Sequence, residues 1–403
     1  MPQSARKTRF FATLFFVLVA LLLAEPVLLW ADRIRGDGSG VVAGFSVARL
    51  LGTLRWLVVG VGLLAAGVRS RSGAVQNLTL GLFTTVLLLG LLELTCGWLL
   101  KKQAATGPNI AGPIHSMHLD PFLGYKPQPD TALTGVRTKD GQVIYRIEFQ
   151  TDSNNLRVTP PATRAVPGKY ALFFGCSMTF GEGVQSRETL PYYFAKADST
   201  YRPYNLAYSG YGPQQTLARL QHDTPRRFVP EAQGVAFYTY IPDHVNRVIQ
   251  SLTNYGYNRG NAPYYYLDGD SLRYGGLFSQ GRKFRNWVYE VAGKSNILTF
   301  FKIGYPFQLR DRDYDLAAEV LAQSAAEYRR QFGNDRFYVI IYPTTLPQEA
   351  IVSRLKARGV RVLDYSRLFN PLQKGYSIPS DEHPTPLANR VLIAQLVKDL
   401  RKY

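Results

Sequence analysis

The chain has 403 residues and a mass of 45.2 kDa, enough for two or three structural units. Its composition, 46% hydrophobic and 19% charged, excludes a disordered chain, and two cysteines exclude a disulfide scaffold or a cysteine-rich metal site. The net charge of +18 comes from basic residues interleaved with acids rather than from a dense block. We therefore interpret it as a solvated basic surface and expect no nucleic-acid partner.

The first hundred residues are strongly apolar, and residues 1–102 are predicted to form a transmembrane anchor. Each apolar stretch can cross a hydrocarbon core about 30 Å thick. The predicted spans are 10–31, 45–68 and 75–100. Basic residues before the first span leave a cleaved signal peptide as the alternative. The positive-inside rule places the N-terminus and the turn 69–71 in the cytoplasm, and everything after Lys101 in the periplasm or outside the cell. The sequence thus predicts a multi-pass protein of the inner, cytoplasmic membrane.

Four charged residues lie within the predicted spans: Glu25, Glu93, Arg49 and Arg55. Charges inside a bilayer are costly unless they are paired or hydrated. The predicted topology brings the two acids and the two arginines to similar depth, so we expect at least one acid to contact one arginine. The alternative is that the arginines extend to the membrane surface independently.

Beyond a linker and extended lead-in segment at 103–168, with one or two strands, residues 169–403 alternate strand-like and helix-like stretches. The predicted strands are 170–174, 203–207, 235–241, 337–342 and 360–363. The predicted helices are 188–197, 214–222, 316–332, 348–358 and 386–402. Short apolar strands separated by helices indicate a parallel sheet buried on both faces. We expect a flavodoxin-like, three-layer α/β/α domain with a central five-stranded parallel sheet, whose site lies at the carboxyl ends of the strands.

A Tyr-rich insertion at about 245–312 separates the third and fourth strands. Leu267-Asp268-Gly269-Asp270 within it is typical of a hairpin turn. Its aromatic and polar side chains could bind a glycan by stacking, or the segment could simply pack on itself.

The strongest chemical signal follows the first strand of the sheet, in the segment Gly175-Cys176-Ser177-Met178-Thr179-Phe180-Gly181. A serine just past a strand end, flanked by glycines that allow a tight turn, has its hydroxyl displayed at the top of the sheet. Ser177 is therefore the candidate nucleophile.

This segment resembles the first block of the SGNH/GDSL hydrolases and related O-acyltransferases, with Cys176 where the family usually has Asp. The second block is similar to residues 205–215, in which Gly210 matches the oxyanion-hole glycine, and the last block is similar to Asp381-Glu382-His383-Pro384-Thr385. The resemblance covers about 220 residues, and neither the apolar N-terminal part nor the Tyr-rich insertion belongs to it. It implies ester chemistry on cell-envelope material.

Acyl transfer assigns a role to each of these residues. His383 takes the proton from Ser177 and later delivers it to the leaving group, while Asp381 orients the imidazole and stabilises its charged form. The backbone N–H groups of Ser177 and Gly210 are the expected oxyanion donors. This chemistry requires no metal and no cofactor. The pair His115 and His118 is better explained by loop or surface roles than by metal ligation.

The third block departs from the family pattern. Where the family has Gly-x-Asn-Asp, this chain has Ile241-Pro242-Asp243-His244. An aspartate here repels developing negative charge unless it is protonated or turned away. The third oxyanion donor is therefore left open among Asp243, Asn246 and His244. Asp381 also stands two residues before His383 instead of three, a spacing that occurs in polysaccharide O-acetyltransferase relatives.

The sequence as a whole predicts a membrane-anchored serine esterase or O-acyltransferase that acts on ester groups, with acetyl as the first choice, of envelope glycan or lipid. The alternative from another class is a non-catalytic protein of the same fold that binds or helps to assemble envelope polysaccharide. The sequence does not indicate an oligomeric state.

Overall fold

The structure is a computed structural model that describes residues 16–17, 19–21, 23–31, 41–42, 45–106, 110–111, 117–162 and 167–402. The chain divides into two compact units. One unit comprises Met1–Gly107 with Glu290–Ile303, and the other comprises Pro108–Tyr289 with Gly304–Tyr403.

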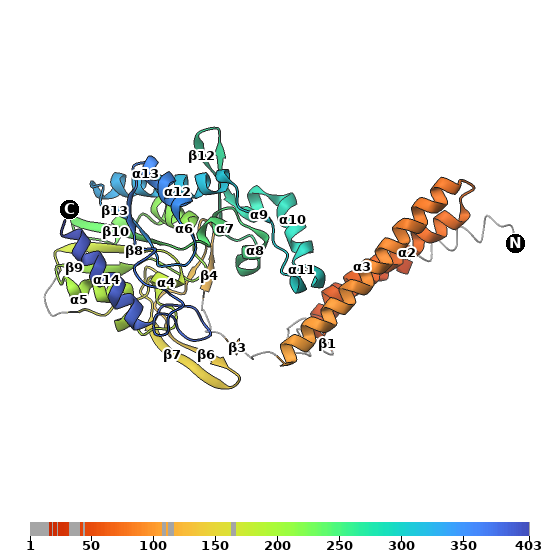
Figure 1. The fold of residues 1–403 in the computed structure, drawn as a ribbon, viewed down its shortest axis with the longest axis horizontal. Coiled ribbons are helices and arrows are strands. Elements are labelled where there is room, and N and C mark those ends of the chain that lie inside the picture. Colours follow the sequence, from red (N-terminus) through yellow and green to blue (C-terminus); the bar gives the residue numbers. More distant parts are fainter. Residues whose placement is uncertain are drawn as a thin grey trace. The chain divides into compact units, whose positions relative to one another are not determined.

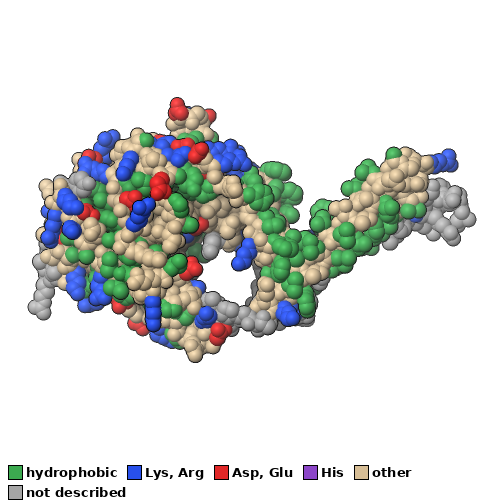
Figure 2. Space-filling model, viewed as in Figure 1, with side chains coloured by type: hydrophobic (Ala, Val, Ile, Leu, Met, Phe, Trp, Pro, Cys, Tyr) green, Lys and Arg blue, Asp and Glu red, His purple; other side chains and the backbone are tan. Residues whose placement is uncertain are grey.

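The first unit consists mainly of two apolar helices, α2 (Val47–Arg69) and α3 (Gly73–Thr106), which expose hydrophobic side chains along their length (Figure 2). Two short antiparallel strands, β1 (Val41–Val42) and β2 (Phe45–Ser46), precede α2. Among the described residues, one helix, Gly73–Gln103, is long and apolar enough to cross a membrane. The three-helix anchor is therefore not confirmed, and the spans at 10–31 and 45–68 stay predictions.

The predicted ion pair between charges of the apolar stretches is confirmed. Arg55 Nη1 lies 2.8 Å from Glu25 Oε2, and Arg55 Nη2 donates to the Leu21 carbonyl at 2.7 Å. Glu93 instead accepts hydrogen bonds from the start of the short helix α11 (Asn296–Phe300). Two of the charges in the apolar stretches are thus paired with each other, which lowers the cost of placing them in an apolar environment.

The second unit is built on a five-stranded sheet, as the sequence predicts (Figure 1). Its strands are β8 (Lys169–Phe174), β9 (Tyr201–Asn205), β10 (Gln233–Tyr240), β13 (Phe337–Ile341) and β14 (Arg361–Asp364). The order is β14-β13-β10-β8-β9, and every neighbouring pair is parallel. This is the flavodoxin-like order, in which ligands bind at the carboxyl ends of the strands where the chain direction across the sheet reverses. Here that point lies between β8 and β10.

Helices cover both faces of this sheet (Figure 1). The helices on one face are α5 (Leu190–Ala197) and α14 (Pro386–Leu400), and those on the other are α6 (Pro213–Ala218), α12 (Asp311–Phe332) and α13 (Glu349–Ala357). Successive residues of a strand point to opposite faces. Phe173 and Phe237 pack under α5 and α14, whereas Leu172 and Tyr238 pack under α6 and α12. The apolar runs are buried on both sides, which confirms the three-layer architecture.

The lead-in segment forms more strands than the one or two expected. The strands β4 (Met117–Asp120) and β5 (Gly124–Pro127) form one antiparallel pair. The strands β6 (Ala132–Lys139) and β7 (Gln142–Gln150) form a longer hairpin, to which β3 (Ile110–Ala111) adds a short edge. Alternate β7 side chains, including Tyr145 and Phe149, pack against Phe180 and Tyr208 in a separate apolar cluster. The hairpin therefore lies beside the segments that follow β8 and β9.

The Tyr-rich insertion packs largely on itself. It contains α7 (His244–Val248), α8 (Leu252–Asn258), the hairpin β11 (Pro263–Asp268) and β12 (Ser271–Leu277), α9 (Phe278–Gly281) and α10 (Lys283–Ala292). The hairpin turn predicted at 267–270 is confirmed. Tyr255, Tyr264, Phe278 and Tyr289 form a buried cluster at its centre. Most of the rings that could have stacked on a glycan therefore contact each other.

Candidate active site

Ser177 lies where the sequence predicts it, immediately after β8. Gly175 has φ +144°, and a Cβ atom there would lie 2.6 Å from Thr179 Oγ1, so this turn requires glycine. Ser177 then begins the short helix α4 (Ser177–Phe180), is half-buried and lines a cleft of about 1010 Å³. Its backbone N–H has no acceptor among the described residues. Both the hydroxyl and the N–H of this residue are therefore available to a ligand in the cleft.

A buried arginine fixes the other end of α4. Arg157 is 2% exposed and donates to the carbonyls of Phe180 (3.0 Å), Gly181 (2.7 Å) and Val184 (2.9 Å). Burial lowers the pKa of Arg157 to about 9, although nearby carboxylates favour its charged form. The guanidinium satisfies carbonyls that the short helix leaves free at its C-terminal end. It thereby holds the turn that carries Ser177.

The loop between β14 and α14 brings His383 and Asp381 to the same cleft. The His383 Nδ1–H donates to Asp381 Oδ1 at 2.7 Å, and Asp381 is 8% exposed. This contact leaves Nε2 of His383 with its lone pair available, as a general base requires. No hydrogen bond joins Ser177 and His383 among the described contacts, although both residues line the cleft.

A second carboxylate, on Glu182, faces the other nitrogen of the ring. Glu182 Oε2 lies 3.9 Å from His383 Nε2 and accepts a hydrogen bond from Ser209 Oγ at 2.6 Å. Burial of the ring opposes its charged form, but the hydrogen bond to Asp381 and the Glu182 charge outweigh it and raise the pKa of His383. Glu182 was not among the site residues predicted from the sequence. Its place between Gly181 and Gly183, in the glycine-rich segment that follows the serine, was the available signal.

The β6–β7 hairpin supplies two further side chains to this cluster. Arg137 and Tyr145 are directly opposite each other across the hairpin, and Arg137 Nη1 lies 3.7 Å from Asp381 Oδ1. Burial raises the pKa of Tyr145, and the Asp381 and Glu182 carboxylates raise it further. Nothing in the local sequence of the hairpin indicated these contacts, because they depend on how it packs against the loop before α14.

Gly210 lies after β9 and also lines the cleft. It has φ +78°, and a Cβ atom there would lie 2.6 Å from the Tyr125 hydroxyl, which donates to the Ser209 carbonyl at 3.0 Å. The Gly210 N–H has no acceptor in the part of the chain that the structure describes. The two N–H groups predicted as oxyanion donors, those of Ser177 and Gly210, are thus both unpaired at this cleft.

The structure places none of the third-block candidates in the cleft lining. Asp243 is held by Arg247 Nε at 2.8 Å and by Asn254 Nδ2 at 3.2 Å, so its carboxylate is neutralised and turned away. His244 is fully buried with its Nδ1 2.6 Å from the Tyr238 hydroxyl. Asn246 lies on α7 and is not among the residues that line the cleft. Arg247 and Asn254 line the cleft in their place, and neither was predicted from the sequence.

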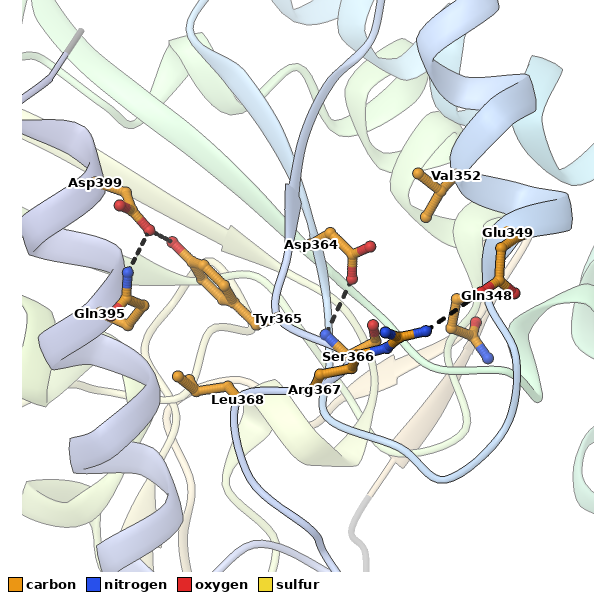
Figure 3. Close-up of a pocket in the computed structure, with 10 residues that line it drawn as sticks. All are labelled: Gln348, Glu349, Val352, Asp364, Tyr365, Ser366, Arg367, Leu368, Gln395 and Asp399. Atoms are coloured by element: carbon orange, nitrogen blue, oxygen red, sulfur yellow. Dashed lines mark hydrogen bonds and ion pairs between the residues drawn. The ribbon is translucent and has the colours of Figure 1, made fainter.

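A second hollow of about 570 Å³ lies beside α13, α14 and the end of β14 (Figure 3). Its polar side chains are mostly paired: Tyr365 and Gln395 donate to Asp399, and Arg367 faces Glu349. Its lining contains no histidine, so Ser366 has no imidazole base there, in contrast to Ser177 in the larger cleft. Elsewhere among the described residues, no three His, Cys, Asp or Glu side chains are grouped to hold a metal ion. His115 lies outside the described residues. Cys96 and Cys176 are both free and buried.

Comparison with known proteins gives matches only to solved structures. No protein-family model and no curated protein sequence matches this chain. A protein described as lipolytic and of the G-D-S-L family, from Desulfitobacterium hafniense, aligns at 11% identity and a TM-score of 0.30, over 57% of this chain and 98% of its own. A catalytic mutant of an acetylxylan esterase from Geobacillus stearothermophilus aligns at 12% identity and a TM-score of 0.33, over 59% of this chain and 95% of its own. An acetyl xylan esterase from Butyrivibrio proteoclasticus aligns at 12% identity and a TM-score of 0.35, over 60% of this chain and 65% of its own.

These solved structures are lipolytic proteins and esterases. The roles of individual residues here are argued from the geometry of this cleft.

Proposed function

We propose that this protein is a membrane-anchored serine esterase or O-acyltransferase that acts on ester groups of cell-envelope glycan or lipid. One observation carries the proposal. A serine at a strand end, a histidine paired with a buried aspartate, and two unpaired backbone N–H groups converge on a single cleft. These are the parts that acyl transfer through a serine requires.

In the proposed reaction, His383 Nε2 takes the proton of Ser177 Oγ as that oxygen bonds to the ester carbonyl carbon. The carbonyl oxygen becomes an oxyanion, which the N–H groups of Ser177 and Gly210 stabilise. When the carbon–oxygen bond to the alcohol breaks, His383 returns its proton to the leaving oxygen and the acyl group stays on Ser177. Water or a sugar hydroxyl then repeats the same steps and releases an acid or a new ester.

Three features support an ester substrate of the envelope. Arg247 and Asn254 give the cleft a polar lining beside the N–H groups, which suits a polar substrate such as a sugar. Apolar side chains of the same cleft, among them Met178 and Ile241, suit a small acyl group. The long apolar helix α3 and the charge pattern around the apolar stretches support an inner-membrane location with this unit in the periplasm or outside the cell.

The test is replacement of the nucleophile. Ser177→Ala should abolish hydrolysis of an aryl acetate and labelling by a fluorophosphonate, because both need the serine oxygen. Ser380→Ala is the matched control: Ser380 lines the same cleft but its hydroxyl contacts Lys139. Unchanged turnover in the Ser177→Ala protein would refute the proposal.

A specific observation also favours the non-catalytic alternative. His383 Nε2 faces Glu182 rather than forming a hydrogen bond to Ser177 in this structure. The binding function is the correct one if the wild-type protein is neither labelled nor active, yet binds envelope polysaccharide with an affinity that Ser177→Ala does not change.

A further inference from the structure

The structure contains an exposed amphipathic segment that the proposed catalytic site does not use. It comprises residues 283–303, that is α10, α11 and the residues after them, and is called here the interfacial segment. On α10, four apolar side chains are exposed at spacings of three and four residues: Phe284 (76%), Trp287 (58%), Val288 (37%) and Val291 (50%). This spacing places all four on one face of the helix.

The opposite face of α10 is packed into the protein. Tyr289 is buried in the aromatic cluster of the insertion, and Asn286 accepts a hydrogen bond from the Tyr255 hydroxyl at 3.0 Å. The helix is therefore held by one face while its apolar face is left uncovered (Figure 2). Soluble proteins rarely expose several large apolar side chains together unless something binds them.

The end of the interfacial segment is attached to the apolar helix α3. Glu93 of α3 accepts hydrogen bonds from the Ser295 hydroxyl at 3.0 Å, from the Ile297 N–H at 3.1 Å and from the Asn296 N–H. Gly97, one turn further along α3, is in close contact with the Asn296 side chain. Residues 290–303 accordingly belong to the same compact unit as α3.

The point of attachment lies where α3 has the side chains of a membrane surface. Trp98 is five residues after Glu93, about 7.5 Å along the helix, and is followed by Lys101 and Lys102. Lys102 Nζ lies 5.6 Å from the Trp98 ring centroid. Tryptophan and lysine are typical of the boundary between hydrocarbon and headgroups. The contact with Glu93 therefore fixes α11 at the depth of this boundary.

The charge of the interfacial segment identifies the partner. Its charged side chains are four basic and one acidic, namely Lys283, Arg285, Lys294, Lys302 and Glu290. The three lysines are exposed. An apolar helical face with a basic border is the pattern that binds the surface of a membrane containing anionic lipid. A protein partner or a second copy would not by itself account for the attachment at the depth of Trp98.

We propose that the interfacial segment is a second membrane contact, with the exposed apolar side chains Phe284, Trp287, Val288 and Val291 of α10 inserted at the lipid surface. This inference rests on the membrane anchoring proposed above. Its consequence is that the chain is held to the bilayer at two places rather than tethered only through α3 and a linker.

Depth-dependent quenching of tryptophan fluorescence tests this proposal in the full chain. The chain has four tryptophans, Trp30, Trp56, Trp98 and Trp287. Conservative Trp→Phe replacements give one protein that keeps only Trp287 and one that keeps only Trp98. A third carries Leu346→Trp as its single tryptophan, because Leu346 is an exposed apolar residue far along the chain from the segment. Each is placed in nanodiscs of zwitterionic lipid with and without phosphatidylglycerol.

We expect lipids brominated near the glycerol to quench the fluorescence of Trp287 and of Trp98. Quenching of Trp287 should be stronger when anionic lipid is present. Acrylamide, which is dissolved in the water, should quench only the Leu346→Trp protein well. Quenching of Trp98 without quenching of Trp287 would overturn the second contact and leave the anchor intact. Absence of quenching at both positions would overturn the anchor as well. Protection of Trp287 from acrylamide without quenching by bromolipid would mean that protein, not lipid, covers this face.

A measurement on the unmodified chain removes any dependence on the replacements. Wild-type protein in nanodiscs that contain a photoactivatable phospholipid should form lipid crosslinks to peptides of residues 283–303 as well as to α3. Crosslinks confined to α3 would contradict the proposal.

Discussion

Glu182→Gln changes the charge beside the general base without changing the size of the side chain. In the wild-type protein, the Glu182 carboxylate lies 3.9 Å from His383 Nε2. Two unit charges about 4 Å apart interact by about 1 kcal/mol in water and by about 4 kcal/mol at an effective dielectric constant of about 20. The His383 side chain is 17% exposed and the Glu182 side chain is 9% exposed, so the interaction energy lies in the upper part of this range. The glutamine oxygen can still accept the hydrogen bond from Ser209.

The sign of the effect follows from the role of the ring. His383 acts as a base only when it is neutral, so kcat/KM falls as the pH drops through its pKa. Glu182 raises that pKa. Removing its charge should therefore lower the pKa and move the acid limb of the kcat/KM profile to lower pH. At a pH on the acid limb of the wild-type enzyme, the Glu182→Gln enzyme should be the faster of the two.

The assay is hydrolysis of an aryl acetate over a range of pH, with Ser177→Ala as the blank. Glu382→Gln is the matched control. Glu382 stands between Asp381 and His383 in the sequence and lines the same cleft, but its side chain is exposed. It is not one of the groups that shift the pKa of His383. An acid limb that stays in place in Glu182→Gln, or that moves equally in Glu382→Gln, would refute the electrostatic reasoning.

Three further predictions concern the supports of the site. Arg137→Gln should move the same acid limb to higher pH, because Arg137 lowers the pKa of His383; Lys139→Gln on the same strand should not. Arg157→Met should destabilise the protein by roughly 3 kcal/mol or more, since it removes a buried charged donor from three carbonyls. Arg146→Met, at an exposed position, should have little effect on the thermal midpoint. Gly210→Ala should lower kcat by about 10²–10³ by displacing an oxyanion donor; Gly141→Ala, at the same φ of +78° but with open space around it, controls for backbone strain, and equal rates for the two would count against Gly210 as a donor.

The sheet could be predicted because its strands are buried on both faces. A strand covered by helices on both sides must be apolar throughout, so residues 170–174 and 337–342 stand out without any knowledge of their neighbours. Crossovers between parallel strands are right-handed, which leaves few possible strand orders, and the flavodoxin-like order is one of them. The lead-in hairpins were underpredicted, since their strands alternate apolar and polar side chains and the polar face masks the pattern.

The candidate triad could be located for a local reason as well. Ser177 needs a glycine before it to make the turn after β8, and Gly210 needs a positive φ, so both leave a mark in the adjacent sequence. Asp381 and His383 are close in sequence, and their hydrogen bond requires no long-range information. Ser177 was predicted from the strand end and the glycines around it, whereas Gly210, Asp381 and His383 were predicted from the resemblance to the SGNH/GDSL sequence blocks.

Their environment could not be named in that way. Glu182, Arg137 and Tyr145 act on the Asp381–His383 pair from two other segments, and the neutralisation of Asp243 by Arg247 and Asn254 depends on how α7 packs against α8. Charges interact through space with an energy that depends on their distance and their burial, and neither quantity can be obtained from the amino-acid sequence alone. The sequence by itself therefore determined which groups can carry the chemistry, while the tertiary structure decided which charges surround the imidazole and which donors line the cleft.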